Sequence, residues 1–167
     1  MAVNNIIKRI QNIMRQDAGI NGDAQRIEQM TWMFFLKVYD TQEETWEYKD
    51  ENYKSIIPED LRWRKWAVDE KDGEALTGEA LLSFVNEKLF PTLKNLPIDA
   101  NTPRAKSIVL ETFADLNQYM KNGTLLRQVV NIVNEIEFDD ADDRHTFGDI
   151  YEGILKDLQS AGTAGEF

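Results

Sequence analysis

Hydrophobic side chains recur at the spacing of an α-helix in several separate stretches of the chain. In residues 3–16 they occupy positions i, i+3, i+4 and i+7, which predicts a first helix with one apolar face. Residues 24–45 contain the run MTWMFFLKVYD, which is apolar on nearly all sides and predicts a helix at the centre of a small helical domain. A strand is the alternative, since aromatic residues also favour sheets, but the preceding AQRIEQM is a poor strand. Gly19 and Gly22 predict a turn between the two helices, and Asp23 is expected to cap the second.

Three further helices are predicted in the second half of the chain. Residues 79–94 place apolar side chains on one face, and Pro91, which falls inside that register, is expected to kink or end the helix. Residues 105–119 are weakly helical, and Thr124 is expected to cap a helix that ends near residue 137. The fold class is therefore all-α: a compact, bundle-like helical domain with long ordered loops. The stretches read as loops or connectors are 46–60, 69–78 and 97–103.

The last stretch of the chain combines a helical pattern with a run of small residues. Thr146 is a plausible cap for a helix that ends near Leu158, and Ser160 to Gly165 has the composition of a flexible linker. We therefore expect residues 1–160 to form a helical N-terminal domain, and residues 161–167 to begin a linker into a further domain.

Composition limits the class of protein. The 167 residues fit one domain, and the 42% of hydrophobic residues predict a packed core. The chain has no cysteine, which excludes disulfides and thiolate metal sites and fits a cytoplasmic protein. The longest apolar run, Met30 to Leu36, is too short to cross a membrane, so no membrane partner is expected.

Taken alone, the formal net charge of −11 argues against a nucleic-acid-binding protein. Acids concentrate in residues 40–60, with eight acids and two bases, and in residues 135–167, with ten acids and two bases. The other residues carry a net charge of +3, so a local basic contact surface is not excluded. The N-terminus has the basic residues of a transit peptide, but its helical spacing favours an ordinary first helix. These basic residues are Lys8, Arg9 and Arg15.

The cluster Leu61-Arg62-Trp63-Arg64-Lys65-Trp66 is the first candidate site. Three cations alternate with two indoles, a combination that binds phosphates while aromatic faces stack on bases. The alternative is that both tryptophans pack into the core while the cations extend to water, and the i, i+3 spacing of the tryptophans suits such packing.

The other candidate sites in the sequence have weaker support. The acidic run from Glu135 to Asp143 lies near His145, the only histidine, but it lacks the glycine of a calcium loop. A solvated linker explains it better. The chain has no phosphate-binding glycine loop, no nucleophile pattern around the histidine, and no Asn-Pro-Pro-aromatic motif, because its four prolines are isolated. We therefore predict no catalytic residue and no metal site in this chain.

Four blocks, in order and spacing, resemble one family: the modification subunit of type I restriction–modification systems, an adenine-specific DNA methyltransferase. The resemblance covers the chain from about residue 20. In the family, the last block leads into a Tyr-Thr-Pro-Arg segment that begins the methyltransferase domain. The blocks are NGDAQRIEQMTWMFFLKVYD, IPEDLRWRKW, LLSFVNEKLFPTLKNL and FGDIYEGILKDLQSAGTAGEF.

The resemblance implies that the full-length protein transfers a methyl group from S-adenosylmethionine to N6 of an adenine flipped out of DNA. The family's catalytic motif and most of its cofactor pocket lie in the following domain. Only Glu166 and Phe167 match the leading edge of the cofactor-binding segment, so this chain alone is expected to be inactive and to bind cofactor weakly or not at all.

The family's N-terminal helical domain helps to clamp DNA and contacts the specificity subunit. The implied partners are DNA, the specificity subunit, a second modification subunit and the restriction subunit. This context favours a phosphate contact by Arg62, Arg64 and Lys65, with the acidic stretches facing solvent or protein partners. The alternatives are a free-standing acidic helical adaptor without catalytic activity and an acidic mimic of DNA.

Overall fold

The computed structural model describes residues 3–68, 75–97, 99–102 and 104–135. Within these ranges every regular element is a helix and no strand occurs, which confirms the all-α prediction. The helices in chain order are α1 (Val3–Met14), α2 (Asp23–Lys49), η1 (Glu59–Leu61), α3 (Trp63–Trp66), α4 (Gly78–Phe84), η2 (Val85–Leu89), α5 (Phe90–Lys94), α6 (Arg104–Ala114) and α7 (Gly123–Val133).

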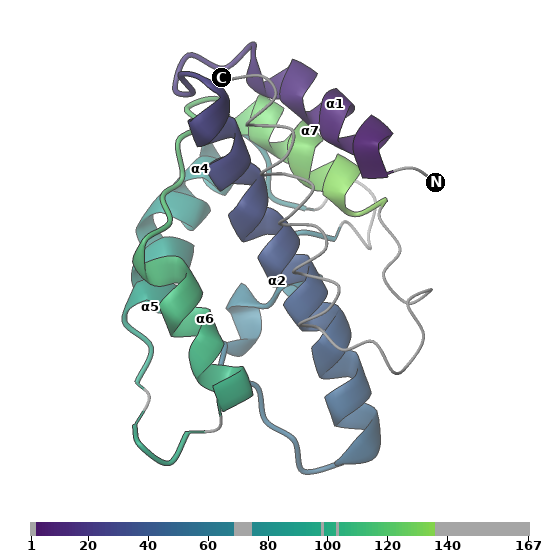
Figure 1. The fold of residues 1–167 in the computed structure, drawn as a ribbon, viewed down its shortest axis with the longest axis vertical. Coiled ribbons are helices and arrows are strands. Elements are labelled where there is room, and N and C mark those ends of the chain that lie inside the picture. The colour runs from purple at the N-terminus through teal and green to yellow at the C-terminus, as the bar shows by residue number, and fades with distance from the viewer. Residues whose placement is uncertain (1–2, 69–74, 98, 103, 136–167) are drawn as a thin grey trace.

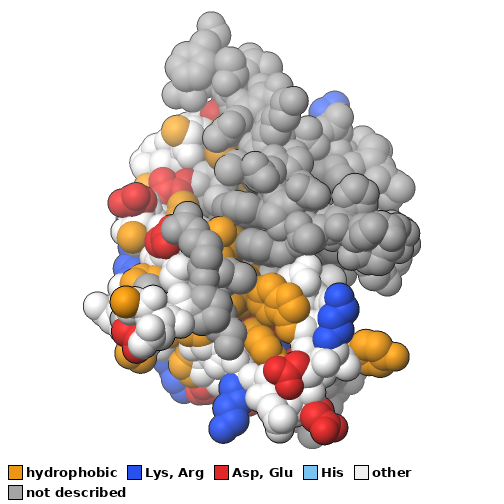
Figure 2. Space-filling model, turned by 60° about the horizontal axis from the view of Figure 1, so that its bottom comes forward, with side chains coloured by type: hydrophobic (Ala, Val, Ile, Leu, Met, Phe, Trp, Pro, Cys, Tyr) orange, Lys and Arg blue, Asp and Glu red, His pale blue; other side chains and the backbone are white. Residues whose placement is uncertain are grey.

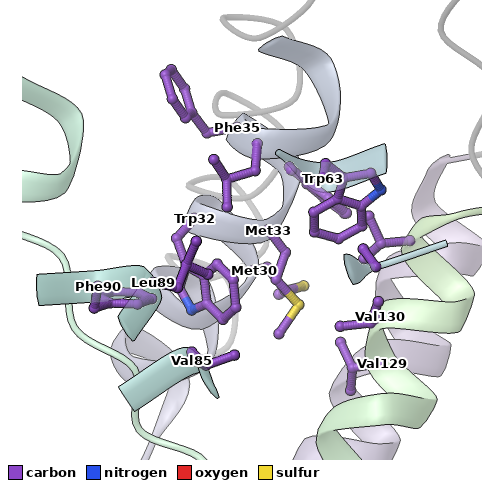
Figure 3. Packing of buried hydrophobic residues seen from close by; sticks show 14 of the residues in the cluster. Met30, Trp32, Met33, Phe35, Trp63, Val85, Leu89, Phe90, Val129 and Val130 are labelled. Carbon is purple, nitrogen blue, oxygen red and sulfur yellow. The ribbon is translucent and has the colours of Figure 1, made fainter. Parts of the chain in front are cut away.

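Helix α2 runs through the middle of the molecule, as the sequence predicted. Figure 1 shows α1 and α7 side by side at its upper end, with α4, α5 and α6 on its other side. Residues Met30 to Leu36 are all buried, because neighbouring helices cover α2 on several sides. In Figure 3, Trp32 points toward Leu89 and Phe90, while Val129 and Val130 of α7 lie across from Met33. The apolar run is therefore the centre of the core.

Helices α4, η2 and α5 follow one another directly, and η2 is a turn of π-helix. Their buried residues recur every four positions, whereas an α-helix repeats every 3.6 residues, so an α-helix would carry such a stripe gradually around its axis. One wider π turn accommodates the extra residue and keeps the stripe on the buried side of the helix. The stripe consists of Leu81, Val85, Leu89 and Leu93.

The prediction that Pro91 ends this helix is wrong, because the helix continues past the proline. The predicted kink stays a prediction, and the π turn of η2 directly precedes Pro91. Pro91 follows Phe90, the first residue of α5, and has no N–H to donate to the preceding turn, which is the wider π turn of η2. The helix then continues to Lys94.

Several predicted helix ends differ from the structure. Gly22, with φ of 90°, precedes α2, and Asp23 lies inside the first turn, where it forms an ion pair with Arg26 instead of capping. Helix α2 extends to Lys49, beyond the predicted residue 45, and α6 ends at Ala114 instead of residue 119. The predicted helix that begins at Thr146 lies outside the described residues, and the domain boundary at residue 160 stays a prediction.

Two helix starts approach each other closely. A Cβ atom added to Gly123 would lie 1.9 Å from the carbonyl oxygen of Gly78, so the first turn of α7 touches the backbone at the start of α4. Only glycine fits at position 123 without displacing one of the two helices.

Helix α7 is capped by Asn122 and not by Thr124. The side-chain oxygen of Asn122 accepts a hydrogen bond of 2.9 Å from the backbone N–H of Leu125, while Thr124 lies exposed within the first turn. Removing such a cap typically costs about 1 kcal/mol. We therefore expect Asn122→Ala to lower the free energy of unfolding by roughly that amount, measured by urea denaturation followed by circular dichroism. Thr124→Ala is the matched control, and a larger decrease in this control would contradict the assignment.

Candidate functional site

The candidate cluster lies at the junction of η1 and α3, against the acidic side of α2. The Arg62 side chain is only 7% exposed. Its Nη2 atom lies 2.6 Å from Glu47 and 3.4 Å from Glu43, and its Nη1 atom lies 3.2 Å from Glu59. Its Nε atom lies 4.0 Å from Asp40, so four carboxylates surround one buried guanidinium. The expectation that this cation extends to water is therefore wrong.

Arg64 and Lys65 are progressively more accessible. The Nε atom of Arg64 donates to Asp40 at 2.9 Å and its Nη1 donates to Glu47 at 2.9 Å, leaving 27% of the side chain exposed. Lys65 is 51% exposed and lies 3.4 Å from Glu59. Of the three predicted DNA-contact residues, Lys65 has the most accessible charge.

The acidic partners of these cations come from one side of α2. Asp40, Glu43 and Glu47 follow the i, i+3, i+7 spacing that places side chains on one helix face. Glu43 is fully buried and Asp40 is 8% exposed, so the expectation that this acidic stretch faces solvent or protein partners is wrong for these two residues. They face the cations of the cluster.

Burial sets the ionisation of this group of acids. Burial raises the pKa of Glu43, although the Tyr53 hydroxyl donates to its carboxylate at 2.6 Å. Burial also raises the pKa of Asp40, opposed by the hydrogen bond from Arg64. Glu47 is more accessible, and the hydrogen bonds from Arg62 and Arg64 outweigh its desolvation and lower its pKa. The ion pairs thus compensate charges that burial alone would disfavour.

The two tryptophans of the cluster belong to the core, which supports the packing alternative over stacking on bases. Trp63 and Trp66 are 3% and 4% exposed. The indole N–H of Trp63 donates to the side chain of Asn134 at 2.8 Å, and that of Trp66 donates to the carbonyl of Leu61 at 3.0 Å. Their faces pack against protein, so they are not available to stack on bases.

Arg127 is a structural cation that the sequence analysis did not single out. It is 7% exposed and interrupts the apolar register of α7. Its guanidinium donates to the carbonyl oxygens of Trp66, Ala67 and Leu76. The signal was a lone arginine within the run LLRQVVNIV, on a helix that is otherwise apolar on that side. Arg127 fastens the end of α3 to α7, as Arg62 and Arg64 fasten its start to α2.

Neither a metal-binding group nor a membrane-spanning helix is found among the described residues. No group of three or more acidic or histidine side chains among them is placed to hold a metal ion. A pocket of about 250 Å³ is lined by polar and apolar side chains from η2, α5 and the segment after α6. His145, Glu166 and Phe167 lie outside the described residues. None of the described helices is long and apolar enough to span a membrane.

The fold and the cluster define the class of this chain, which is an all-α domain whose charged groups fasten helices together. The model of the HsdM N-terminal domain family matches residues 3–133, and the chain belongs to this family.

Its relatives are considerably longer proteins. Over its whole length the chain is 56% identical to the methylase subunit of the type I restriction enzyme EcoEI from Escherichia coli and spans 34% of that protein. A structure described as a modification subunit of a type I restriction enzyme from Vibrio vulnificus YJ016 superimposes with a TM-score of 0.80 at 32% identity, covering 98% of this chain and 37% of that one. A chain from work on complex assembly and conformational transition of the type I R-M system has a TM-score of 0.69 at 33% identity, covering 93% of this chain and 30% of that one.

Proposed function

We propose that this chain is the part of a type I adenine methyltransferase that holds DNA and contacts other subunits. One observation carries the proposal: over its whole length the chain is 56% identical to about a third of a methylase subunit. In the full-length protein, a methyl group would pass from S-adenosylmethionine to N6 of an adenine flipped out of the duplex.

The cofactor and the chemistry belong mainly to the part of such proteins that this chain does not span. Glu166 and Phe167 are proposed to form only the edge of the S-adenosylmethionine site. The proposed protein partners are the specificity subunit, a second modification subunit and the restriction subunit. The solved relative whose title concerns complex assembly supports such partners, and the proposed DNA substrate implies work in the cytoplasm.

A contact of Arg62, Arg64 and Lys65 with DNA stays a proposal. The three side chains differ in how accessible their charges are. Lys65 is accessible enough to reach a phosphate. Arg62 is enclosed by carboxylates, so its contribution would be to position the segment that carries Lys65. Family membership favours this function over a free-standing adaptor.

Methyl transfer from labelled S-adenosylmethionine to DNA tests the proposal. We expect no transfer by residues 1–167 alone, and transfer by the full-length subunit assembled with a specificity subunit. Digestion of the product to nucleosides should place the label in N6-methyladenine. Transfer by residues 1–167 alone, or label in cytosine, would contradict the proposed function.

A further inference from the structure

Positive charge gathers at one end of the molecule, where α1 meets α7. Residues 8–28 and 117–135 together hold six basic and four acidic residues, whereas residues 40–65 hold five basic and eight acidic ones. The two helices are antiparallel, since Arg9 of α1 bonds to Glu135 after α7 at one end, and Asp17 bonds to Lys121 before α7 at the other. Figure 1 shows this end at the top and the far end of α2 at the bottom.

The acids at this end are already bonded to protein groups. The buried carboxylate of Asp17 accepts from the backbone N–H groups of Gly19, Lys121 and Asn122 at 2.8 to 3.0 Å. Glu28 accepts from the backbone N–H of Asn117 at 2.6 Å.

The other two acids have arginine partners. Glu135 pairs with Arg9, whose hydrogen bond lowers the pKa of the carboxyl, and Asp23 pairs with Arg26. The acids of this end therefore have protein partners of their own.

Three exposed cations at the same end have no carboxylate partner among the described residues: Lys8, Arg15 and Lys121. Lys8, Asn12 and Arg15 follow the i, i+4, i+7 spacing and therefore share one face of α1, with about 10 Å between the first and the last. Arg15 donates to the Asn12 side chain at 3.1 Å, which holds the guanidinium along this face. Lys121 lies beside the turn after α1, since its Cγ would be 2.8 Å from a Cβ on Gly19.

We propose that this basic stripe, made of Lys8, Asn12, Arg15 and Lys121, contacts the phosphate backbone of DNA. The inference rests on the proposed function and names the surface that carries it. Lysine, arginine and asparagine are among the side chains that bind phosphate oxygens, and such contacts position a protein on the duplex without reading its sequence.

Phosphate fits the stripe better than a protein partner does. Protein interfaces place large apolar or aromatic side chains at their centre. Among the described residues, the exposed large hydrophobic side chains are Tyr48 and Val68, and neither belongs to the stripe. The view in Figure 2, in which the bottom of the molecule comes forward, shows basic, acidic and apolar side chains interspersed outside its grey region. That coloured region presents no continuous basic surface.

The test uses the full-length subunit assembled with a specificity subunit, in which Lys8, Arg15 and Lys121 are replaced by alanine. We expect DNA affinity to fall at least tenfold, equally on DNA with and without the recognition site. The slope of log K against log salt should flatten by about 1 for each phosphate that the variant no longer neutralises, and so by about 3. The matched control replaces Lys49, Lys54 and Lys88, three exposed cations elsewhere, and should leave the slope unchanged. Circular dichroism and sedimentation check folding and assembly.

The possible results distinguish an error in the proposed DNA-contact surface from an error in the proposed DNA-binding function. An unchanged slope in the stripe variant, with a flatter slope for Lys65→Ala, would overturn the stripe and keep a DNA role for the domain. Unchanged slopes in both variants would overturn the stripe and the DNA role together. A failure of subunit assembly with unchanged DNA affinity would assign the stripe to an acidic protein partner and overturn the proposal.

Discussion

Replacing Arg62 by alanine should destabilise the domain by about 3–5 kcal/mol, the usual result of removing one partner from a buried ion pair. Arg62 lies within 3.4 Å of Glu43, whose side chain is 1% exposed. Arg64 continues to hold Asp40 and Glu47. Glu43 would be left in the interior without a cation, where stability is lost whether the carboxylate stays charged or takes up a proton. Since small domains have a total stability of about 5–15 kcal/mol, the decrease should be evident in urea denaturation.

Two further variants serve as controls for Arg62→Ala. Lys65→Ala removes a neighbouring cation that is half exposed, and it should change stability by no more than about 0.5 kcal/mol. Adding Glu43→Gln to Arg62→Ala should recover part of the stability, because the buried charge is then gone. An Arg62→Ala variant as stable as Lys65→Ala would show that the guanidinium reaches water and that the ion pairs do not fasten η1 and α3 to α2.

Trp32→Ala should have an effect of similar size, about 3–5 kcal/mol, because it empties the centre of the core. Trp32 is fully buried, its ring meets Phe90 edge-on at 5.0 Å, and it stacks on Trp66 at 6.4 Å. Figure 3 shows the indole between α2 and the segment Leu89–Phe90. Thermal or urea unfolding measures the decrease in stability.

Trp32→Phe is the closest control for this substitution. The indole N–H of Trp32 has no hydrogen-bond partner among the described residues, and an unpaired buried donor costs about 1–3 kcal/mol. Phenylalanine removes this group and keeps most of the packing, so the variant should lie within about 1.5 kcal/mol of the parent chain. Tyr48→Ala, at a side chain that is 92% exposed, should change little. Equal decreases in Trp32→Ala and Tyr48→Ala would contradict the central place of α2.

The fold was predictable where a local pattern determines it. The run around Trp32 and Phe35 is apolar on all sides, and its burial at the centre of a helical domain followed directly. The packing of Trp63 and Trp66 followed from their spacing. Helix ends were harder to predict. Asp23, for example, could either cap the helix or pair with a side chain inside the first turn, and in the structure it pairs with Arg26.

The candidate site was less predictable, because its pairings are long-range. Arg62 lies 19 residues after Glu43 in the sequence. By local composition, Arg62 belonged to a basic cluster and Glu43 to a separate acidic stretch. Folding brings η1 and α3 back against α2, so the two features neutralise each other. The basic stripe shows the opposite effect of folding. Its cations are separated by up to 113 positions, from Lys8 to Lys121, and only the antiparallel packing of α1 and α7 places them at one end of the molecule.

The most direct measurement is photo-cross-linking of the assembled enzyme to DNA. A benzophenone amino acid replaces Gln16, an exposed residue just after α1, and in a second protein it replaces Tyr48 at the far end of α2. We expect cross-links to DNA from position 16 and none from position 48, because the α1–α7 end faces the phosphates. Cross-links from position 48, with none from position 16, would contradict this arrangement.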